Sequence, residues 1–232
     1  MKIGFIKNLF KGQKSFFSYY FEYLEKIDLK GKKILHLGSG WDKRNIRSRI
    51  KNADLISLDI DYPAIKRNIN TYKVCGDAHS FPFKKESVDY IICEDFLEHV
   101  KDPAQLLKQI FFSLKRGGGF IFVTPGGWSY IAIVARLTPL GFHKWYNRIR
   151  GVDESDVFKT YYRFNSIYRI KRESVKSGLF PEKIVLITGY PSYFDFSKIL
   201  TVIFGFIHYF ISKIVFLNRL IGINIFCVLK KR

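Results

Sequence analysis

The stretch Lys32–Asp61, KKILHLGSGWDKRNIRSRIKNADLISLDID, constrains the chain more than any other part of it. A short apolar run, residues 34–37, leads directly into Gly38-Ser39-Gly40, and a second apolar run, residues 55–58, stops at Asp59. Strand, glycine turn, helix-capable segment, strand and carboxylate form a unit that holds nucleoside-bearing cofactors. Glycine allows a ligand to approach the backbone, because no Cβ stands in the way. A carboxylate at the end of the second strand can accept hydrogen bonds from both hydroxyls of a ribose.

The alternation of strand and helix continues from this stretch to Pro125. The pattern predicts strands at 33–37, 55–59, 70–75, 88–93 and 120–125, and helices at 42–50, from 61, and from 102 to a stop at the glycines 117–119. Alternation at this spacing predicts a parallel sheet with helices on both faces. Ligands of such sheets bind at the carboxyl ends of the strands, and Gly38, Asp59, Asp77 and Glu94 all fall there.

The glycine turn argues against a dinucleotide. It reads G-S-G-W and lacks the third glycine that a dinucleotide fingerprint uses where the helix meets the pyrophosphate. Trp41 and Asp42 stand where a pyrophosphate needs small residues and free N–H groups, and Asp42 would repel it. A cofactor with a ribose and an adenine but no phosphate fits the turn better.

The order of five motifs identifies a family resemblance. KILHLGSG, SLDID, GDAHSFPF, VDYIICEDFLEHV and LKRGGGFIFVTP, between Lys32 and Pro125, resemble the class I S-adenosylmethionine-dependent methyltransferases, especially the small-molecule branch. The segment LTPLGFHKWYNRIRGVDESDVFKTYYRFN resembles a bacterial subgroup of these enzymes with unassigned acceptors. The resemblance implies a Rossmann-like, doubly wound α/β sheet of seven strands, mostly parallel with the last antiparallel. It also implies S-adenosylmethionine as the cofactor.

The resemblance assigns roles to residues at the strand ends. Gly38, Ser39 and Gly40 would pass beneath the methionine and ribose, Asp59 would bind the ribose hydroxyls, and Ile60 would pack on adenine. Asp77 would accept from the adenine amino group, with the Ala78 N–H facing a ring nitrogen. The implied cofactor site therefore comprises His36, Gly38, Ser39, Gly40, Asp59, Ile60, Asp77, Ala78 and Glu94, the last acting near the methionine amino group through its backbone carbonyl.

Two histidines and a basic aromatic segment bear on activity. His36 stands where the family usually has an acid, so either Glu94 or water compensates for the missing negative charge, or cofactor binding is weaker. No catalytic residue is assigned, because methyl transfer needs a base only when the acceptor must lose a proton. His99 is a weak candidate for that base. The candidate acceptor residues are Arg148, Arg150, Tyr161, Tyr162 and Arg163, whose alternative role is an ordinary solvated or packing surface.

The chain divides into four expected parts. These are an N-terminal amphipathic helical segment (1–31), the cofactor-binding core (32–125), an acceptor lid (126–178), and two last strands with an apolar helical insertion at 189–222 (179–232). The predicted strands of the last part are 183–188 and 223–229. The uncharged run within the insertion, residues 199–212, is too short to span a bilayer, which needs about 20 apolar residues.

Charge and cysteine content limit the partners. Lys and Arg number 39 against 20 Asp and Glu, giving a formal charge of +19 that favours a nucleic acid, an anionic membrane surface or a phosphorylated substrate. The three cysteines have no metal-ligand spacing, so we expect no metal and a reducing cytoplasm. Together with the basic N-terminus, the insertion favours a peripheral contact with the inner membrane, or else burial or a homodimer interface.

The sequence therefore predicts a methyltransferase acting on a small molecule or a lipid- or glycan-linked acceptor near a membrane surface. Two alternatives stay open: an RNA methyltransferase, although the chain shows no recognisable RNA-binding module, and a non-catalytic cofactor-binding protein associated with a membrane.

Overall fold

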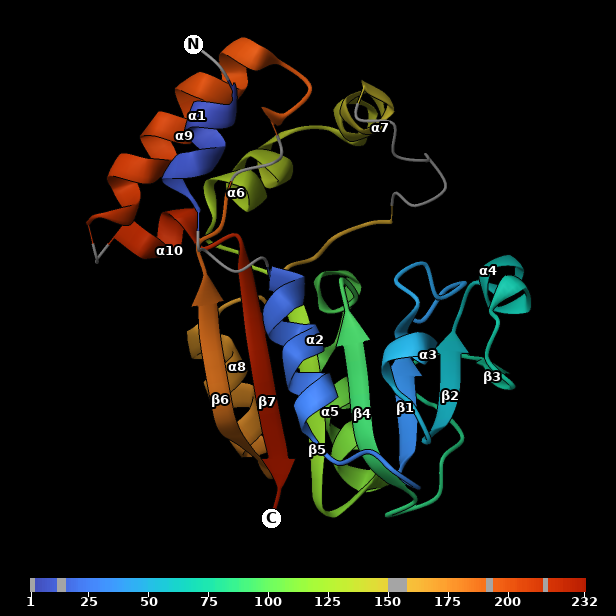
Figure 1. Ribbon diagram of the computed structural model, residues 1–232. Coiled ribbons are helices and arrows are strands. Elements are labelled where there is room, and N and C mark those ends of the chain that lie inside the picture. The colour runs from blue at the N-terminus through green and yellow to red at the C-terminus, as the bar shows by residue number, and fades with distance from the viewer. Residues whose placement is uncertain (1–2, 12–15, 150–157, 191–193, 215–216) are drawn as a thin grey trace.

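The fold is known from a computed structural model, which describes residues 3–11, 16–149, 158–190, 194–214 and 217–232. The described residues form one sheet with the strand order β3-β2-β1-β4-β5-β7-β6 (Figure 1). The strands are β1 Lys33–Leu37, β2 Asp54–Asp59, β3 Tyr72–Cys75, β4 Val88–Glu94, β5 Leu114–Pro125, β6 Leu179–Ile187 and β7 Asn224–Lys231. β7 pairs antiparallel with both β5 and β6, and the other pairings are parallel. The predicted Rossmann-like sheet with an antiparallel last strand is confirmed.

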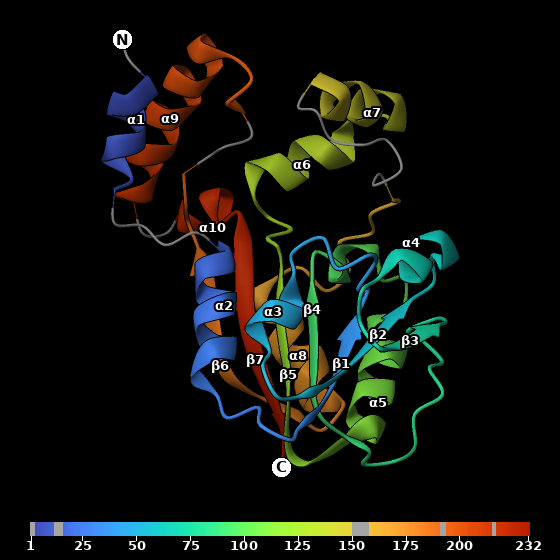
Figure 2. The ribbon, with the colours of Figure 1, turned by 45° about the vertical axis from the view of Figure 1, so that its right-hand side comes forward.

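Helices cover both faces of this sheet (Figure 2). The helices are α1 Ile3–Leu9, α2 Phe16–Lys26, α3 Ile46–Arg49, α4 Tyr62–Arg67, the 3-10 turn η1 Leu97–His99, α5 Pro103–Ser113, α6 Tyr130–Leu137, α7 Leu140–Ile149, α8 Ile167–Lys176, α9 Lys198–Ser212 and α10 Asn218–Ile221. Side chains of α5 and α8 join one buried core with the sheet, and side chains of α2 and α3 join the other. Continuous apolar strands are required between two such cores, because each strand is covered on both faces.

Two expectations about element bounds are wrong. The helix predicted at 42–50 is reduced to α3, because Asp42 and Asn45 adopt positive φ of 60° and 52° before it begins. The glycines 117–119 do not precede the fifth strand but lie within β5. A Cβ on Gly118 would lie 2.7 Å from the Asp89 carbonyl oxygen, so bare backbone is needed where β5 starts beside β4.

The last two strands form the closing edge of the sheet. β6 begins at Leu179, earlier than the predicted Lys183, and the register shifts at Pro181, which an edge strand tolerates because one side of it makes no ladder bonds. β7 returns to the opposite end of the sheet. There Lys231 is buried, and its Nζ donates to the carbonyl oxygens of Phe111 and Leu114 at 2.8 and 2.7 Å.

Beyond the C-terminal ends of the parallel strands lies a group of helices. Figures 1 and 2 both place α1, α6, α7 and α9 there, with α1 and α9 side by side. Among the described residues, no helix is long and apolar enough to cross a membrane.

Candidate active site at the C-terminal edge of the sheet

The glycine turn after β1 is shaped by two left-handed residues. Gly38 has φ +63° and Gly40 has φ +47°, a region that side chains disfavour. A Cβ on Gly38 would lie 2.5 Å from the Phe96 ring, so this glycine is also required by packing. A Cβ on Gly40 would have no neighbour among the described residues within 4 Å. The backbone at Gly40 therefore faces open space, as a cofactor cradle requires.

Asp59 at the end of β2 fixes this turn. Its Oδ2 accepts from the Gly40 N–H at 2.7 Å, and its Oδ1 accepts from the Asp61 N–H at 2.9 Å. Each carboxylate oxygen has more than one acceptor position, so these bonds leave capacity for a ligand. Next to it, the Ile60 side chain is 71% exposed, which makes its aliphatic surface accessible to a flat ring.

A buried amide network supports the turn from below, and no sequence pattern pointed to it. Asn68 Nδ2 donates to the Gly40 carbonyl oxygen at 2.7 Å, while its Oδ1 accepts from the Asn70 N–H at 2.9 Å. Asn70 Nδ2 donates to Ser57 Oγ at 2.8 Å. Asn68, Asn70 and Ser57 are all buried. Asparagines after a surface helix look like ordinary loop residues in the sequence, so only the fold shows that they point inward.

Asp42 occupies the position that a pyrophosphate would take. Its carboxylate is buried and accepts from the N–H groups of Ile46 at 2.8 Å and Arg47 at 3.2 Å. These are the free donors at the start of a helix that bind phosphate in dinucleotide folds. With an acid already bonded there, the site suits a cofactor without phosphate.

His36 and Glu94 form a buried pair at the ends of β1 and β4. His36 Nε2 lies 3.0 Å from Glu94 Oε1, and Tyr20 of α2 donates its hydroxyl to Glu94 Oε2 at 3.0 Å. Burial lowers the pKa of His36, but the charge and hydrogen bond of Glu94 raise it by more, so the net shift is upward. The neighbouring strand thus places a carboxylate directly against the position 36 side chain. His36 Nδ1 is buried without a partner among the described residues.

Asp95 and Arg44 close the same region from the outside. Arg44 donates to the Asp95 carboxylate, and its guanidinium lies 3.6 Å above the centre of the Phe17 ring. Burial raises the pKa of Asp95, and the positive charge of Arg44 opposes that rise. Helix α2 therefore contacts Glu94 through Tyr20 and the Arg44 partner of Asp95 through Phe17, which the N-terminal sequence pattern did not predict.

Asp77 is exposed and turns onto its own loop. Its Oδ1 accepts from the His79 N–H and lies 2.8 Å from His79 Nδ1. The backbone hydrogen bond from His79 is the main reason why the pKa of Asp77 is lowered. Ala78 is buried beside it, and the Gly76 N–H donates to the Asp59 carbonyl oxygen at 2.9 Å. The ends of β2 and β3 are thereby joined at one edge.

Glu98 ties the segment at 161–165 to the ends of β4 and β5. Its backbone carbonyl accepts from the N–H groups of Tyr161 at 2.7 Å and Tyr162 at 3.2 Å. Thr124 donates to its carboxyl at 3.3 Å, and Asn165 Nδ2 donates to Thr124 Oγ1 at 2.6 Å. Burial, and next the charge of Asp95, raise the pKa of Glu98 to about 8. In the sequence, Glu98 was recognisable only as part of a family motif. Nothing there indicated that it lies at the centre of this hydrogen-bond network.

His99 faces the same segment. Its Nδ1 lies 2.9 Å from the Lys159 carbonyl oxygen, which fixes Nδ1 as the protonated nitrogen, because a carbonyl can only accept. The remaining nitrogen, Nε2, then carries the lone pair. Burial lowers the pKa of His99, so the ring is neutral near pH 7 and can accept a proton at Nε2.

The candidate acceptor residues are only partly brought together. Tyr161 and Tyr162 lie beside Glu98, whereas Arg148 is exposed on α7 and Arg150 lies outside the described residues. Arg163 donates to the Lys101 carbonyl oxygen at 2.8 Å and borders a cavity of about 600 Å³. The charged residues lining that cavity are Lys101, Asp102, Arg163, Arg169, Arg172 and Glu173.

Comparison with known proteins decides the family. The model of a family described as "Methyltransferase domain" matches residues 35–122, which include the glycine turn, Asp59, Asp77 and Glu94. Residues 35–122 therefore form a methyltransferase domain of the class I S-adenosylmethionine-dependent family. The cofactor of this family is S-adenosylmethionine, and the turn without phosphate donors fits it.

Curated relatives match this chain over part of its length. The ribosomal protein L11 methyltransferase of Prochlorococcus marinus is 28% identical over 44% of the chain, which covers 37% of that protein. A ubiquinone biosynthesis O-methyltransferase of Coxiella burnetii is 28% identical over 44% of the chain, which covers 48% of that protein. The chain thus spans less than two thirds of the length of these relatives.

Solved methyltransferase structures share the fold over nearly the whole chain. A putative S-adenosylmethionine-dependent methyltransferase from Listeria monocytogenes superposes with a TM-score of 0.62 at 13% identity, covering 93% of this chain and 99% of that one. The geranyl diphosphate C-methyltransferase of Streptomyces coelicolor gives a TM-score of 0.59 at 15% identity, covering 93% and 77%. At such identities the likeness extends to the fold alone.

Proposed function

We propose that the chain transfers a methyl group from S-adenosylmethionine to a small or lipid- or glycan-linked acceptor. The observation that carries the proposal is the cradle in which Asp59 holds the Gly40 N–H while Asn68 holds the Gly40 carbonyl. When bound, S-adenosylmethionine supplies a sulfonium-activated methyl group. The protein then has to position the two reactants, which is the main source of acceleration in a displacement of this kind.

The cofactor is held, in this proposal, by four strand ends. Asp59 accepts from the two ribose hydroxyls, with Ile60 packing on adenine. Asp77 accepts from the adenine amino group, and the Ala78 N–H donates to the ring. The remaining cofactor residues, which line the methionine and ribose, are His36, Gly38, Ser39, Gly40 and Glu94.

The methionine end is the unusual part of this site. His36 contacts one Glu94 carboxylate oxygen and the Tyr20 hydroxyl donates to the other, so this carboxylate is already engaged within the protein. The proposal therefore retains the Glu94 backbone carbonyl as the acceptor for that amino group. The Glu94 side chain is assigned to His36 and Tyr20 instead.

Proton removal, where the acceptor needs it, is assigned to His99. Its Nε2 carries the lone pair, since Nδ1 is bonded to the Lys159 carbonyl. A neutral imidazole near pH 7 is a suitable general base. Tyr161, Tyr162 and Arg163 border the same region, and Arg163 offers a guanidinium to an anionic group on the acceptor.

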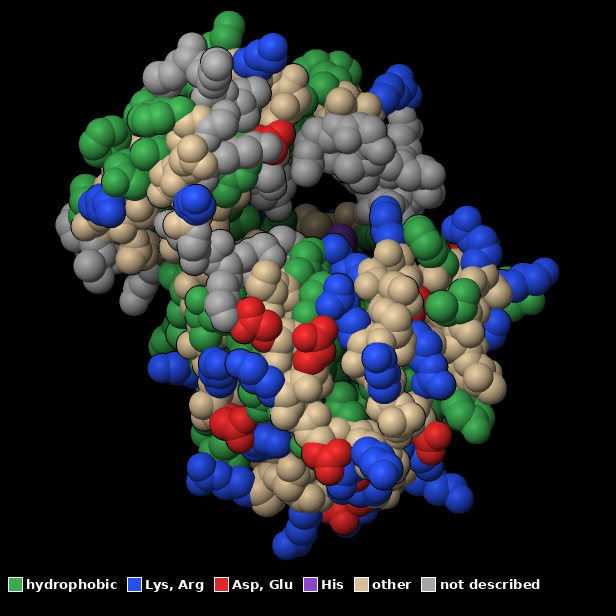
Figure 3. Space-filling model, in the orientation of Figure 1, with side chains coloured by type: hydrophobic (Ala, Val, Ile, Leu, Met, Phe, Trp, Pro, Cys, Tyr) green, Lys and Arg blue, Asp and Glu red, His purple; other side chains and the backbone are tan. Residues whose placement is uncertain are grey.

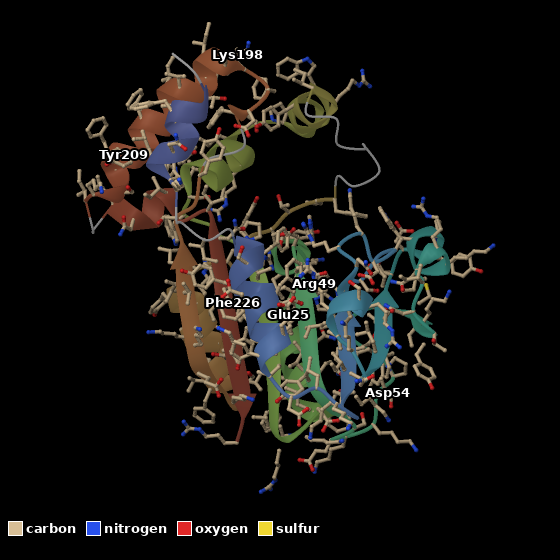
Figure 4. The ribbon with its side chains drawn as sticks, viewed as in Figure 1. Glu25, Arg49, Asp54, Lys198, Tyr209 and Phe226 are labelled. Carbon is tan, nitrogen blue, oxygen red and sulfur yellow. The ribbon has the colours of Figure 1, made fainter. Side chains whose placement is uncertain are left out.

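Calorimetric titration with S-adenosylhomocysteine tests the cofactor proposal. Asp59→Ala should abolish binding, while Asp54→Ala, at the other end of the same strand (Figure 4), should bind as the wild type does. Absence of binding by the wild-type protein would refute the proposed function. The acceptor class is tested by mass spectrometry of lipids and glycans from a deletion strain, in which the acceptor should accumulate lighter by one methyl group.

RNA methylation is the second candidate, because the formal charge of +19 suits a polyanion. RNA binding that persists at high salt would favour it over a small acceptor. Absence of such binding would favour the small or lipid- or glycan-linked acceptor instead.

A further inference from the structure

Helix α9 buries two polar residues, Thr201 and His208, and exposes large apolar ones. Thr201, Gly205 and His208 form its buried face. The opposite face carries large apolar side chains, of which Ile199 is 71% and Phe210 is 64% exposed. A helix on a soluble domain normally has the reverse arrangement, because apolar burial drives packing. The outer face of α9 is thus built for an apolar environment.

The buried face of α9 packs against other parts of the chain. A Cβ on Gly205 would lie 2.3 Å from Ile6 Cγ2, so α1 packs directly on the α9 backbone. The His208 ring lies 5.7 Å from the Phe10 ring and 6.2 Å from the Tyr130 ring of α6. Burial lowers the pKa of His208 to about 4, which keeps it neutral among these rings. This packing fixes which face of α9 points outward.

The outer face forms one continuous stripe. We define the α9 stripe as the exposed residues Ile199, Ile203, Ile207 and Phe210 of α9, together with Ile214 just after the helix. The spacing of three and four residues places the four helical members along one side of α9. Phe5 of α1 is also exposed and lies 6.3 Å, ring to ring, from Phe206, which extends the apolar surface onto α1. Figure 3 shows apolar side chains gathered over these two helices.

The charges near the stripe are mainly positive. Lys198 and Lys213 flank α9 and are exposed, as is Lys11 beyond α1. No Asp or Glu occurs in residues 1–21 or 196–232; the nearest acid before α9, Asp195, pairs with the Tyr190 hydroxyl. A second copy would bring the same positive charges face to face, which opposes dimerisation through this face. An anionic lipid surface attracts them.

The length of α9 excludes a span and permits a parallel arrangement. Fifteen residues of helix extend about 22 Å, which is short of the roughly 30 Å hydrocarbon core. A helix with an aliphatic face and lysines at its ends lies in the interface instead, with the apolar face in the acyl boundary. Figure 4 labels Lys198, the first residue of α9, and Tyr209, in its last turn.

We infer that the α9 stripe inserts into an anionic bilayer surface, with Lys11, Lys198 and Lys213 at the headgroups. Helices α1 and α9 lie beyond β6 and β7, at the same end of the sheet as the Gly40 and Asp59 positions after β1 and β2 (Figures 1 and 2). The bilayer is then on the side of the candidate active site. Resting on the proposed methyl transfer, this narrows the acceptor to a molecule that partitions into the membrane.

Vesicle sedimentation tests the surface independently of activity. The probe is the full chain with vesicles of phosphatidylcholine containing phosphatidylglycerol, compared with phosphatidylcholine alone. Replacing Ile203, Ile207 and Phe210 by Gln should reduce partitioning by about tenfold or more. The matched control replaces Phe112, Tyr168 and Val175 by Gln, which are similarly exposed on α5 and α8, and should bind as the wild type does.

Three further measurements check folding, the role of the lysines and the independence of cofactor binding. Circular dichroism checks that each variant folds; if the triple variant does not, Lys198→Gln with Lys213→Gln replaces it and should remove the preference for phosphatidylglycerol. Equal pelleting of stripe and control variants, or a dimer that the stripe substitutions dissociate without any vesicle binding, would overturn the inference. Titration with S-adenosylhomocysteine on the same proteins separates the two proposals: vesicle binding without cofactor binding refutes only the methyl transfer, and the converse refutes only the bilayer contact.

Discussion

Asn68 and Gly40 are joined by a hydrogen bond of 2.7 Å from the side-chain amide of one to the carbonyl of the other. We expect Asn68→Ala to weaken S-adenosylhomocysteine binding, because the turn loses the group that orients it. The unmade bonds should also lower the free energy of unfolding by about 1–3 kcal/mol. Calorimetry and urea denaturation measure both effects. Asn8→Ala, an exposed position on α1, is the control, and equal losses in the two variants would contradict the role given to Asn68.

Gly38 and Gly40 should respond differently to alanine. Gly38→Ala places a methyl group against Phe96 and is expected to destabilise the fold by about 1–3 kcal/mol through overpacking and strain. Gly40→Ala meets no neighbour among the described residues, so the fold should tolerate it better while cofactor binding is lost. Thermal unfolding and calorimetry separate the two. Adding Phe96→Ala should restore part of the stability of Gly38→Ala and leave Gly40→Ala unaided.

The His36–Glu94 pair predicts a pH dependence of stability. The folded pKa of His36 is raised, so its contribution is complete below the unfolded value of about 6.5 and is lost as the pH rises through the folded value. The difference in unfolding free energy between the wild type and His36→Gln should therefore shrink toward alkaline pH. When both proteins also carry Glu94→Gln, the difference in unfolding free energy caused by His36→Gln should vary much less with pH. A difference that stays constant with pH would show that the pair is not ionised.

The buried Glu98 carboxyl group predicts a second pH dependence of stability. Its pKa is raised by burial to about 8, so the folded chain keeps the proton that the unfolded chain releases near pH 4. Stability is then lost as the pH rises from about 4 to 8, and Glu98→Gln, which mimics the protonated acid, should become progressively more stable than the wild type over that range. Denaturation at several pH values measures this. Glu25→Gln, an exposed partner of Arg49 (Figure 4), should show no such trend.

The features that the sequence predicted share one property: each is a local pattern at a strand end. Gly38, Gly40 and Asp59 are marked by the switch from an apolar run to a glycine or an acid, and the sheet order then brings them together. Asn68, Tyr20 and Glu98 carry no such mark. Their roles depend on which way a side chain points after long-range packing, which a spacing pattern does not contain.

The start of β5 and the outward face of α9 also depend on long-range packing, which the sequence pattern does not contain. Glycines at 117–119 look like a break, because their use in a strand depends on the close approach of Asp89. The apolar run in α9 predicted a buried, interfacial or dimeric helix without choosing among them. The choice of its outward face depends on Ile6 and Phe10, which lie about two hundred residues away in the chain.

The buried Lys231 at the end of β7 has a practical consequence. It anchors the end of the chain to the Phe111 and Leu114 carbonyls, at the side of the sheet remote from the glycine turn and from α9. A label or support attached after Arg232 would thus hold the molecule by its far end. A surface coated in this way would present the cofactor turn and the α9 stripe outward together, which lets one immobilised sample report on ligand and vesicle binding in sequence.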